Sequence, residues 1–461
     1  MKSSEKKINV TYQLNKNGFD LKLFSGLKSS VSYPPEIIKN MDKKLLEDLT
    51  QNFIYCRTRT LTFNTDYHLN YQFPKPFFKK IVDFGINGDL PHIADTYNIN
   101  TSKLKKSLKE SDQSPRINFD KNGIGSQKPL FKKTLDNHIL IAMSFGKDSL
   151  LTYALAKELG LKNHLVFVNE MEKSNAGEYH FKKQILKDFS RQEKIPVYDL
   201  SDDIDEIHFD PRLSKKMEEL ESTNGMLALT LELLPYAVQF KTKYILFGNE
   251  KNLDDFYFNR DKVKTFPSFD QTTFYTRQEN SYLQKYTSGN IKIVSLIEPL
   301  YNLAEMKIIY HRYPYLLQYL MSCYPPEHSA DRWCYSCPMC AKAFLYSAAV
   351  GGDPKAISLK KNMFESKYKN LYPLFTPVIK RAYEKPPVVR EEQLLSFLLA
   401  YGQGWRGGLI DLFKKRYLNE ASRKEKMLRK KFFSIHAITT IPKELRNKLI
   451  KIYQEELKDL T

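Results

Sequence analysis

A six-residue segment between an apolar run and a helical pattern most constrains the fold of this chain. Residues 139–143 are all apolar and predict a buried strand. Residues 144–149 read Ser-Phe-Gly-Lys-Asp-Ser, and residues 150–159 have the apolar pattern of a helix that ends at Gly160. A strand, a short loop and a helix N-terminus in this order indicate an anion site, because the first N–H groups of a helix and its dipole both favour phosphate.

The residue types in this loop suit phosphate chemistry. Gly146 lets the backbone approach a ligand closely, and the hydroxyls of Ser144 and Ser149 can donate hydrogen bonds. Lys147 adds a positive charge, and Asp148 can cap the helix or help to hold Mg²⁺. A tight turn at the end of a core strand is the simpler alternative. The loop is not the P-loop of kinases and GTPases, because G-x-x-x-x-G-K-[ST] is absent.

Strand-like and helix-like patterns alternate through the middle of the chain. Further strands are predicted at 164–168, 195–199, 244–247 and 291–295, with helices around 181–189 and over 225–240. This alternation predicts an α/β fold with a mostly parallel sheet covered by helices on both faces. Ligands of such sheets bind at the carboxyl ends of the strands. We therefore expect Asn169, Glu170 and Gly248 to lie at the same edge as residues 144–149.

Composition shifts along the chain predict four regions. Residues 1–110 resemble an accessory α+β domain, with short strands within 10–24 and 57–73 and a helix over 43–54. Residues 111–136 are rich in Ser, Pro, Gly and Asn and indicate a linker. Residues 137–352 form the α/β domain, and residues 353–461 form a helical extension with helices at 391–400, 409–418 and 442–457.

The chain of 461 residues has a net charge of +19, which favours a polyanionic partner such as nucleic acid. Lysine enrichment from an AT-rich genome is the alternative, with the charge spread over a solvated surface. Two basic clusters stand out at 103–109 and 423–431. Trp405 lies in a glycine-rich loop, where a partly buried ring is favoured over a base-stacking one.

Hydrophobic patterning gives no indication of a membrane protein. No apolar run reaches the roughly 18 residues of a membrane span. Residues 1–7 have no apolar core of the kind found in signal peptides. We therefore expect a cytoplasmic protein without a membrane partner and with reduced thiols. The oligomeric state is not predicted.

Four of the five cysteines lie in one window: Cys323, Cys334, Cys337 and Cys340. Four thiolates complete a tetrahedral shell for Zn²⁺, and two-residue gaps suit a tight knuckle around one ion. An iron–sulfur cluster is the alternative. His328 lies within the window, but four cysteines already suffice. Cys56 is distant and is interpreted as a small core residue.

The loop at 144–149 resembles the PP-loop of the ATP pyrophosphatase superfamily, usually S-G-G-x-D-S, with Phe145 in place of the first glycine. Together with the cysteine spacing it resembles the 7-cyano-7-deazaguanine synthase (QueC) family. In that family a segment like T-P-L-x-x-L-x-K-x-E precedes the cysteines. Here residues 298–307 read Glu-Pro-Leu-Tyr-Asn-Leu-Ala-Glu-Met-Lys, with the charged pair in reversed order.

The resemblance covers roughly residues 136–352 and implies an adenine nucleotide α-hydrolase fold that uses ATP, Mg²⁺ and Zn²⁺. It implies that the loop residues Ser144, Phe145, Gly146, Lys147, Asp148 and Ser149 hold the phosphates, with Lys147, Asp148 and Ser149 as the catalytic group. Asn169 and Gly248 complete the expected nucleotide site, with Asn169 and Glu170 placed to reach the adenosine. The substrate segment of the family matches poorly, so Asp270 is either a substrate contact or a solvated loop acid.

Three functions follow from the resemblance. The first is a ligase that activates a small-molecule carboxylate, such as that of a 7-deazaguanine-like base, as an acyl-adenylate and releases pyrophosphate before an amine attacks. The second is an anti-phage defence protein, similar to the QueC-like proteins of Qat-type operons, that joins such a base to a protein or nucleic acid. The third is a non-catalytic nucleotide-binding protein that assembles with partners.

Overall fold

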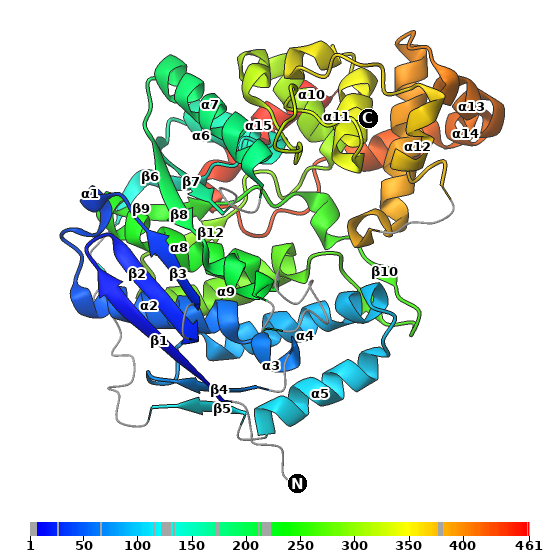
Figure 1. Cartoon of the computed structure of the whole chain (residues 1–461). Coiled ribbons are helices and arrows are strands. Elements are labelled where there is room, and N and C mark those ends of the chain that lie inside the picture. Colours follow the sequence, from blue (N-terminus) through cyan, green and yellow to red (C-terminus); the bar gives the residue numbers. More distant parts are fainter. Residues whose placement is uncertain are drawn as a thin grey trace.

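A ten-stranded sheet forms the centre of the described part of the chain, with helices on both of its faces (Figure 1). The computed structural model describes residues 7–24, 27–64, 67–113, 116–120, 131, 134–170, 175–210, 213, 223–376, 381–458 and 460. The sheet is mostly parallel, since six of the nine strand pairs within it are parallel. The predicted α/β class is therefore confirmed.

The strands lie in the order β12-β9-β6-β7-β8-β3-β2-β1-β4-β5. Their bounds are β12 Lys292–Val294, β9 Thr242–Leu246, β6 Leu135–Ala142, β7 Lys162–Asn169, β8 Val197–Asp202, β3 Leu27–Ser32, β2 Gly18–Phe24, β1 Lys7–Asn15, β4 His68–Tyr71 and β5 Ile117–Phe119. A separate antiparallel hairpin consists of β10 Tyr257–Phe258 and β11 Lys264–Thr265.

The first five strands of this order are parallel, so the loops that follow them share one edge. The apolar run in β6 explains its central place. Ile139 and Ile141 pack into one hydrophobic core, and Leu140 packs into the other. Because alternate side chains of a strand point to opposite faces, a continuous apolar run fits a strand that is covered on both sides.

Two sets of helices cover the two faces (Figure 1). The core of Ile139 includes α6 Lys147–Glu158, α7 Ala176–Glu193, α10 Asn302–Arg312, α11 Pro338–Ala349, α12 Pro387–Gly402, α13 Gly408–Arg416, α14 Leu418–Phe433 and α15 Lys443–Leu457. The core of Leu140 includes α1 Pro35–Ile38, α2 Lys43–Thr58, α3 Leu61–Asn64, α4 Lys79–Thr96, α5 Thr101–Gln113, α8 Gly225–Phe240 and α9 Thr273–Tyr286. None of the described helices combines the length and apolar character needed to cross a membrane.

The predicted strands and helices of the middle region are found within a few residues of their expected bounds, and α8 matches residues 225–240. The prediction of strands within 57–73 is wrong for its first part, because α2 continues to Thr58 and α3 follows it. The turn between these helices is fixed by Arg59, which is fully buried and pairs with Asp83 of α4 at 3.2 Å. This tertiary contact outweighs the local strand propensity of the β-branched and aromatic residues there.

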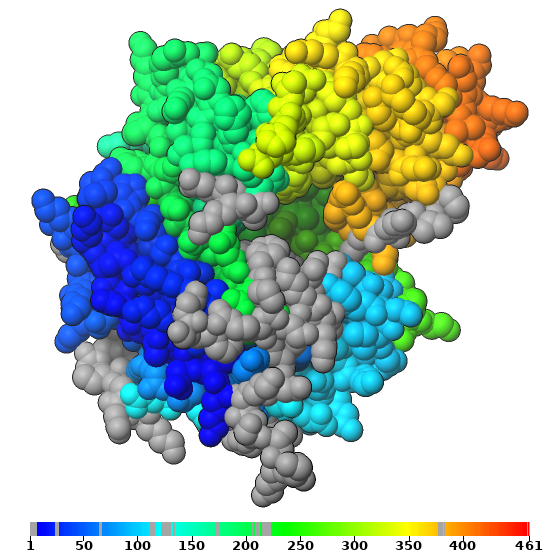
Figure 2. Space-filling model, viewed as in Figure 1, coloured from blue at the N-terminus to red at the C-terminus, as the bar shows by residue number. Residues whose placement is uncertain are grey.

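The N-terminal strands continue the same sheet, since β3 pairs antiparallel with β8 through Val31–Asp202 and Ser32–Ser201. Residues near the N-terminus cover the lower part of the face seen in Figure 2, and the C-terminal helices cover the upper right. The expected boundary at residue 110 falls inside α5. Residues 114, 115, 121–130, 132 and 133 of the expected linker lie outside the described residues, and the division into domains stays a prediction.

Two buried glutamates attach the C-terminal helices to the core. Glu298 accepts hydrogen bonds from the backbone N–H groups of Thr439 and Thr440, at 2.6 and 2.8 Å to its Oε1 atom. Glu392 of α12 accepts a hydrogen bond of 3.0 Å from the backbone N–H of Leu303, at the start of α10. An acidic group at a helix N-terminus is stabilised by the helix dipole. These contacts fix the segment that leads into α10.

Candidate functional site

Residues 143–146 connect β6 to α6, and residues 147–149 form the first turn of α6 at the carboxyl edge of the parallel strands. Hydrogen bonds among residues 144–149 stabilise the turn of the backbone. The Ser144 N–H donates to Ser149 Oγ at 3.3 Å, and the Gly146 N–H faces Ser144 Oγ at 3.4 Å. Gly146 is the N-cap of α6, and no side chain caps the helix there. The first N–H groups of α6 therefore have the arrangement expected of an anion site.

Phe145 has a left-handed backbone, with a φ of 59°. Glycine adopts this region readily, whereas other residues do so at a cost. The side chain of Phe145 is fully buried and packs against Phe189 of α7, with ring centroids 5.5 Å apart. Residue 145 therefore has a glycine-like backbone although its side chain is large. The backbone keeps the conformation that suits glycine, and ring packing offsets its cost.

Gly248 follows β9 closely and contacts the loop. A Cβ atom at this position would lie 2.6 Å from Cβ of Asp148, which is closer than side chains approach one another. The absence of a side chain at Gly248 therefore allows the segments after β6 and β9 to meet. This contact brings together two of the predicted site residues.

Three carboxylates and one ammonium group form a cluster next to the loop. One oxygen each of Asp148, Glu250 and Glu305 lies within 4.8 Å of the others. The Lys147 Nζ atom bonds to Asp148 and Glu305 and lies 3.8 Å from Glu250. Glu250 follows β9, and Glu305 lies on α10. Lys147 therefore occupies a position between carboxylates that a metal cation would also suit.

Burial and charge act against each other in this cluster. Burial raises the pKa of Glu250 to about 7 and holds the pKa of Glu305 well above its ordinary value. Burial alone would also raise the pKa of Asp148, but the adjacent Lys147 lowers it overall. Burial opposes the charge on Lys147, whereas the three carboxylates raise its pKa. The raised pKa values favour protonated Glu250 and Glu305, so a cation that bound the three carboxylates would displace protons from them.

Two further lysines support the site and were not predicted. Lys182 of α7 is buried and donates hydrogen bonds to the carbonyl oxygens of Ser144 and Met321, the latter at 2.9 Å. Burial lowers its pKa to about 8. Lys342 of α11 lowers the pKa of both Asp148 and Glu250, so its charge acts on the same cluster. No sequence motif marks these lysines, because helices distant in the sequence bring them to the loop.

The segment after β7 belongs to a second acidic cluster. One carboxylate oxygen of Glu170 lies within 4.8 Å of those of Asp202, at the end of β8, and Glu232 of α8. Burial raises the pKa of Glu232 well above its ordinary value, and Arg57 of α2 partly opposes this. The structure therefore groups Glu170 with these acids. Asn169 is buried at the end of β7, and its expected contact with adenosine stays a prediction.

Asp270 is not a solvated loop acid, because only 6% of the residue is exposed. Its Oδ2 atom accepts a hydrogen bond of 3.0 Å from the backbone N–H of Met226, in the first turn of α8. Burial raises its pKa to about 6. The side chain therefore acts as a structural partner of the α8 N-terminus, and no contact with a substrate is needed to explain it.

The four cysteines of the predicted knuckle come together. Their Sγ atoms are separated by 3.4 Å (Cys323–Cys340), 3.5 Å (Cys337–Cys340), 3.8 Å (Cys334–Cys340) and 4.0 Å (Cys323–Cys337). Sulfur atoms about 2.3 Å from a tetrahedral zinc ion would lie about 3.8 Å apart. The cluster can therefore hold one metal ion such as zinc.

His328, Cys56 and Trp405, which the sequence also singled out, lie outside the group of four cysteines. His328 is exposed and is not part of the cysteine cluster. Cys56 is buried, and burial raises the pKa of its thiol to about 12, as expected for a core residue. Trp405 is partly buried, with its ring 5.3 Å from Phe344 of α11. Cys337 is the N-cap of α11, so the cysteine cluster lies at the start of the helix that contains Lys342.

Comparison with known proteins adds no assignment to this geometry. No protein-family model matches the chain, and no curated protein matches it.

Proposed function

We propose that the chain is an ATP-dependent ligase of the PP-loop type that cleaves ATP between its α- and β-phosphates. The observation that supports this most is the meeting of a phosphate-type loop with three carboxylates: residues 144–149 at the start of α6, and Asp148, Glu250 and Glu305 beside them. Phosphate groups need N–H donors and positive charge, and the Mg²⁺ that accompanies ATP needs carboxylate oxygens.

In this proposal the triphosphate binds over the N-terminus of α6. Asp148, Glu250 and Glu305 would hold Mg²⁺, which stabilises negative charge on the phosphates. Lys147 is paired with these carboxylates in the described structure. With Mg²⁺ held by these carboxylates, the Lys147 ammonium would be free to contact the phosphates. Lys342 supplies further positive charge from α11.

We propose further that the co-substrate is a carboxylate, as in the QueC family. An oxygen of this carboxylate attacks the α-phosphorus, the bond to the bridging oxygen breaks, and pyrophosphate leaves with the electron pair. An amine then attacks the acyl-adenylate and releases AMP. The chain would hold the carboxylate in line with the phosphorus, and positioning of this kind lowers the barrier to reaction. A zinc ion in the cysteine cluster would have a structural role, because four thiolates leave no open position.

The test uses the full chain with ATP labelled at the α-phosphate, 7-carboxy-7-deazaguanine and ammonium. We expect labelled AMP together with pyrophosphate, and a product of lower mass by mass spectrometry. If mass spectrometry instead finds the acyl group attached to a protein or nucleic acid, the defence-type reaction is supported. Labelled ADP, or no cleavage of ATP with any carboxylate, would contradict the proposed ligase. Binding of the nucleotide without its cleavage would favour the non-catalytic protein that assembles with partners.

Two substitutions on α6 form a matched pair. Lys147→Met removes the ammonium from the carboxylate cluster, whereas Lys157→Met removes an ammonium that pairs with Glu193 at 2.6 Å near the other end of the helix. We expect Lys147→Met to slow AMP release by about 100-fold or more, the usual effect of losing one charge-stabilising group. Lys157→Met should retain the wild-type rate. Circular dichroism checks that both variants are folded, and equal rates would refute the role of Lys147.

A further inference from the structure

An array of phenylalanine rings lies outside the site described above. Eight large hydrophobic residues are exposed in the described part of the chain, and three of them are phenylalanines from one short stretch. Phe256, Phe258 and Phe274 are 39%, 66% and 51% exposed. Exposed apolar rings cost solubility, and a group of them indicates a binding surface.

The exposed rings are connected through neighbouring rings. The centroid distances are 5.7 Å for Phe258–Phe256, 6.1 Å for Phe256–Phe266, 6.0 Å for Phe266–Phe269, 6.2 Å for Phe269–Phe274 and 5.9 Å for Phe274–Phe84. These spacings are those of rings in direct contact. The series extends from the β10–β11 hairpin to α4.

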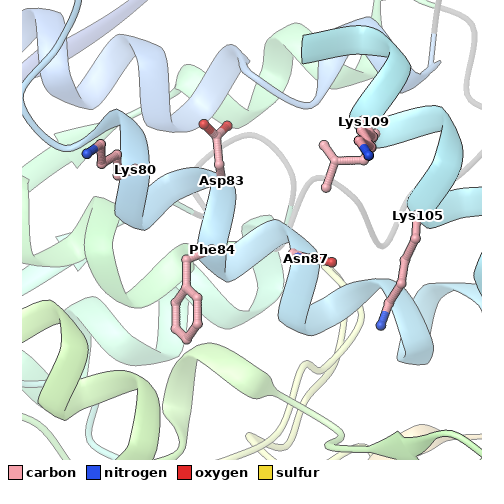
Figure 3. A pocket seen from close by; sticks show the side chains of 7 residues that line it. Lys80, Asp83, Phe84, Asn87, Lys105 and Lys109 are labelled. Atoms are coloured by element: carbon pink, nitrogen blue, oxygen red, sulfur yellow. The ribbon is translucent and has the colours of Figure 1, made fainter. Parts of the chain in front are cut away.

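Phe84 at the end of this series also lines a groove between α4 and α5. The groove has a volume of about 480 Å³, and its lining includes Lys80, Lys105 and Lys109 (Figure 3). Lys80 and Phe84 come from α4, whereas Lys105 and Lys109 come from the basic cluster at 103–109 on α5. The phenylalanine series and the basic groove therefore meet at one residue.

The groove is positively charged. Within the described residues, no ion pair involves Lys80, Lys105 or Lys109. The acid that lines the groove is Asp83, which already pairs with Lys79 and with buried Arg59. The three lysines therefore face solvent without a neutralising acid in the groove.

Hydrogen bonds fasten the hairpin to the two helices of the groove. Asp261, between β10 and β11, accepts hydrogen bonds from the backbone N–H of Thr101 at 2.6 Å and from Asn100 Nδ2 at 3.2 Å. Asn259 Nδ2 donates to the Pro91 carbonyl oxygen at 3.1 Å. The rings and the lysines are therefore held in a fixed arrangement. We call this set the aromatic–lysine surface: Phe84, Phe256, Phe258, Phe274, Lys80, Lys105 and Lys109.

We propose that the aromatic–lysine surface binds single-stranded nucleic acid. Unpaired bases stack on exposed aromatic rings, and lysines contact the phosphates that connect them. In a duplex the bases are already stacked inside the helix, so the rings would have nothing to bind. The net charge of +19 attracts the strand from a distance. This inference is independent of the proposed ligase activity, because it rests on different residues.

The test measures binding of a fluorescent oligothymidylate of about 20 nucleotides to the full chain over a range of salt concentrations. We compare Phe258→Ala/Phe274→Ala, Lys105→Gln/Lys109→Gln and the control Lys426→Gln/Lys430→Gln. The control removes the same charge from exposed positions on α14. All six positions are exposed, and thermal unfolding followed by circular dichroism checks that the variants are folded.

We expect the phenylalanine variant to bind about tenfold more weakly or worse, with an unchanged salt dependence, because it loses stacking on two rings. In the Lys105/Lys109 variant, the plot of the logarithm of the binding constant against the logarithm of the salt concentration should be less steep by about 1.4. Each phosphate contact to a single strand contributes about 0.7 to the steepness of this slope. The control should leave affinity and slope close to those of the wild type.

Three results would overturn the proposal. The first is wild-type affinity in the phenylalanine variant. The second is a salt dependence that becomes less steep by the same amount in the control as in the Lys105/Lys109 variant, since this would show attraction by total charge alone. The third is a duplex of the same length that binds as tightly as the single strand and loses affinity equally in the phenylalanine variant.

Discussion

The left-handed backbone of Phe145 leads to a prediction that does not depend on the function. We compare Phe145→Ala with Phe145→Gly. Each variant loses the buried ring and its contact with Phe189 at 5.5 Å. Replacing a buried phenylalanine with alanine costs about 3–5 kcal/mol in the free energy of unfolding. Both variants should therefore be less stable than the wild type.

The difference between the two variants tests the backbone. Glycine ordinarily costs about 0.5–1 kcal/mol relative to alanine, because its unfolded chain is more flexible. At a φ of 59°, however, alanine pays about 1–2 kcal/mol for the left-handed conformation and glycine does not. We therefore expect Phe145→Gly to be the more stable variant by about 0.5–1 kcal/mol, which reverses the usual order.

Urea unfolding followed by tryptophan fluorescence measures this difference. Trp333 is fully buried and reports on the core that contains Phe145. Equal m-values would allow the midpoints to be compared directly. If Phe145→Ala is as stable as Phe145→Gly or more stable, residue 145 does not have the described backbone. The account of how this loop departs from the glycine pattern would then fail.

Two further predictions concern the cysteine cluster and a buried acid. Elemental mass spectrometry of the purified protein should find about one zinc ion per chain. Cys334→Ser should lose this ion, whereas the control Cys56→Ser should retain it. Zinc retained in Cys334→Ser would exclude the cysteine cluster as the zinc site. Burial raises the pKa of Glu279 from 4.5 to about 8, so the folded state binds more protons than the unfolded state between these values and the wild type loses stability as pH rises through them. The Glu279→Gln variant cannot ionise and keeps an acceptor for Thr230 Oγ1. In urea unfolding, the difference in stability between this variant and the wild type should therefore grow in favour of the variant by up to about 5 kcal/mol from pH 4 to pH 9. A difference that does not change with pH would contradict the raised pKa.

The core of the fold could be predicted because its sequence signals are local. Residues 139–143 and 225–240 are apolar on nearly all sides, and only elements buried on a sheet tolerate this. The cysteine spacing likewise places its ligands within one short window. Strand order in the N-terminal part could not be read, because the pairing of β3 with β8 joins residues that lie far apart in the sequence.

Only part of the candidate site could be predicted. The loop residues are adjacent in sequence, whereas Glu250, Glu305 and Lys342 come from three separate segments. Glu250 and Lys342 look like ordinary surface charges until the fold brings them to Asp148, and Glu305 is marked only by its place in the segment 298–307. The left-handed backbone at Phe145 could not be predicted either, because a bulky residue gives no sign of this conformation.

The contacts of Glu298 with Thr439 and Thr440 bear on how the protein matures during translation. About 140 residues separate Glu298 from Thr440, and at about 5–20 residues per second a ribosome needs roughly 7–28 s to add them. Until then the nascent chain contains residues 144–149 but lacks the partner that fixes the segment before Glu305. A half-made polypeptide would therefore expose buried acids for many seconds, an interval in which chaperones could protect it.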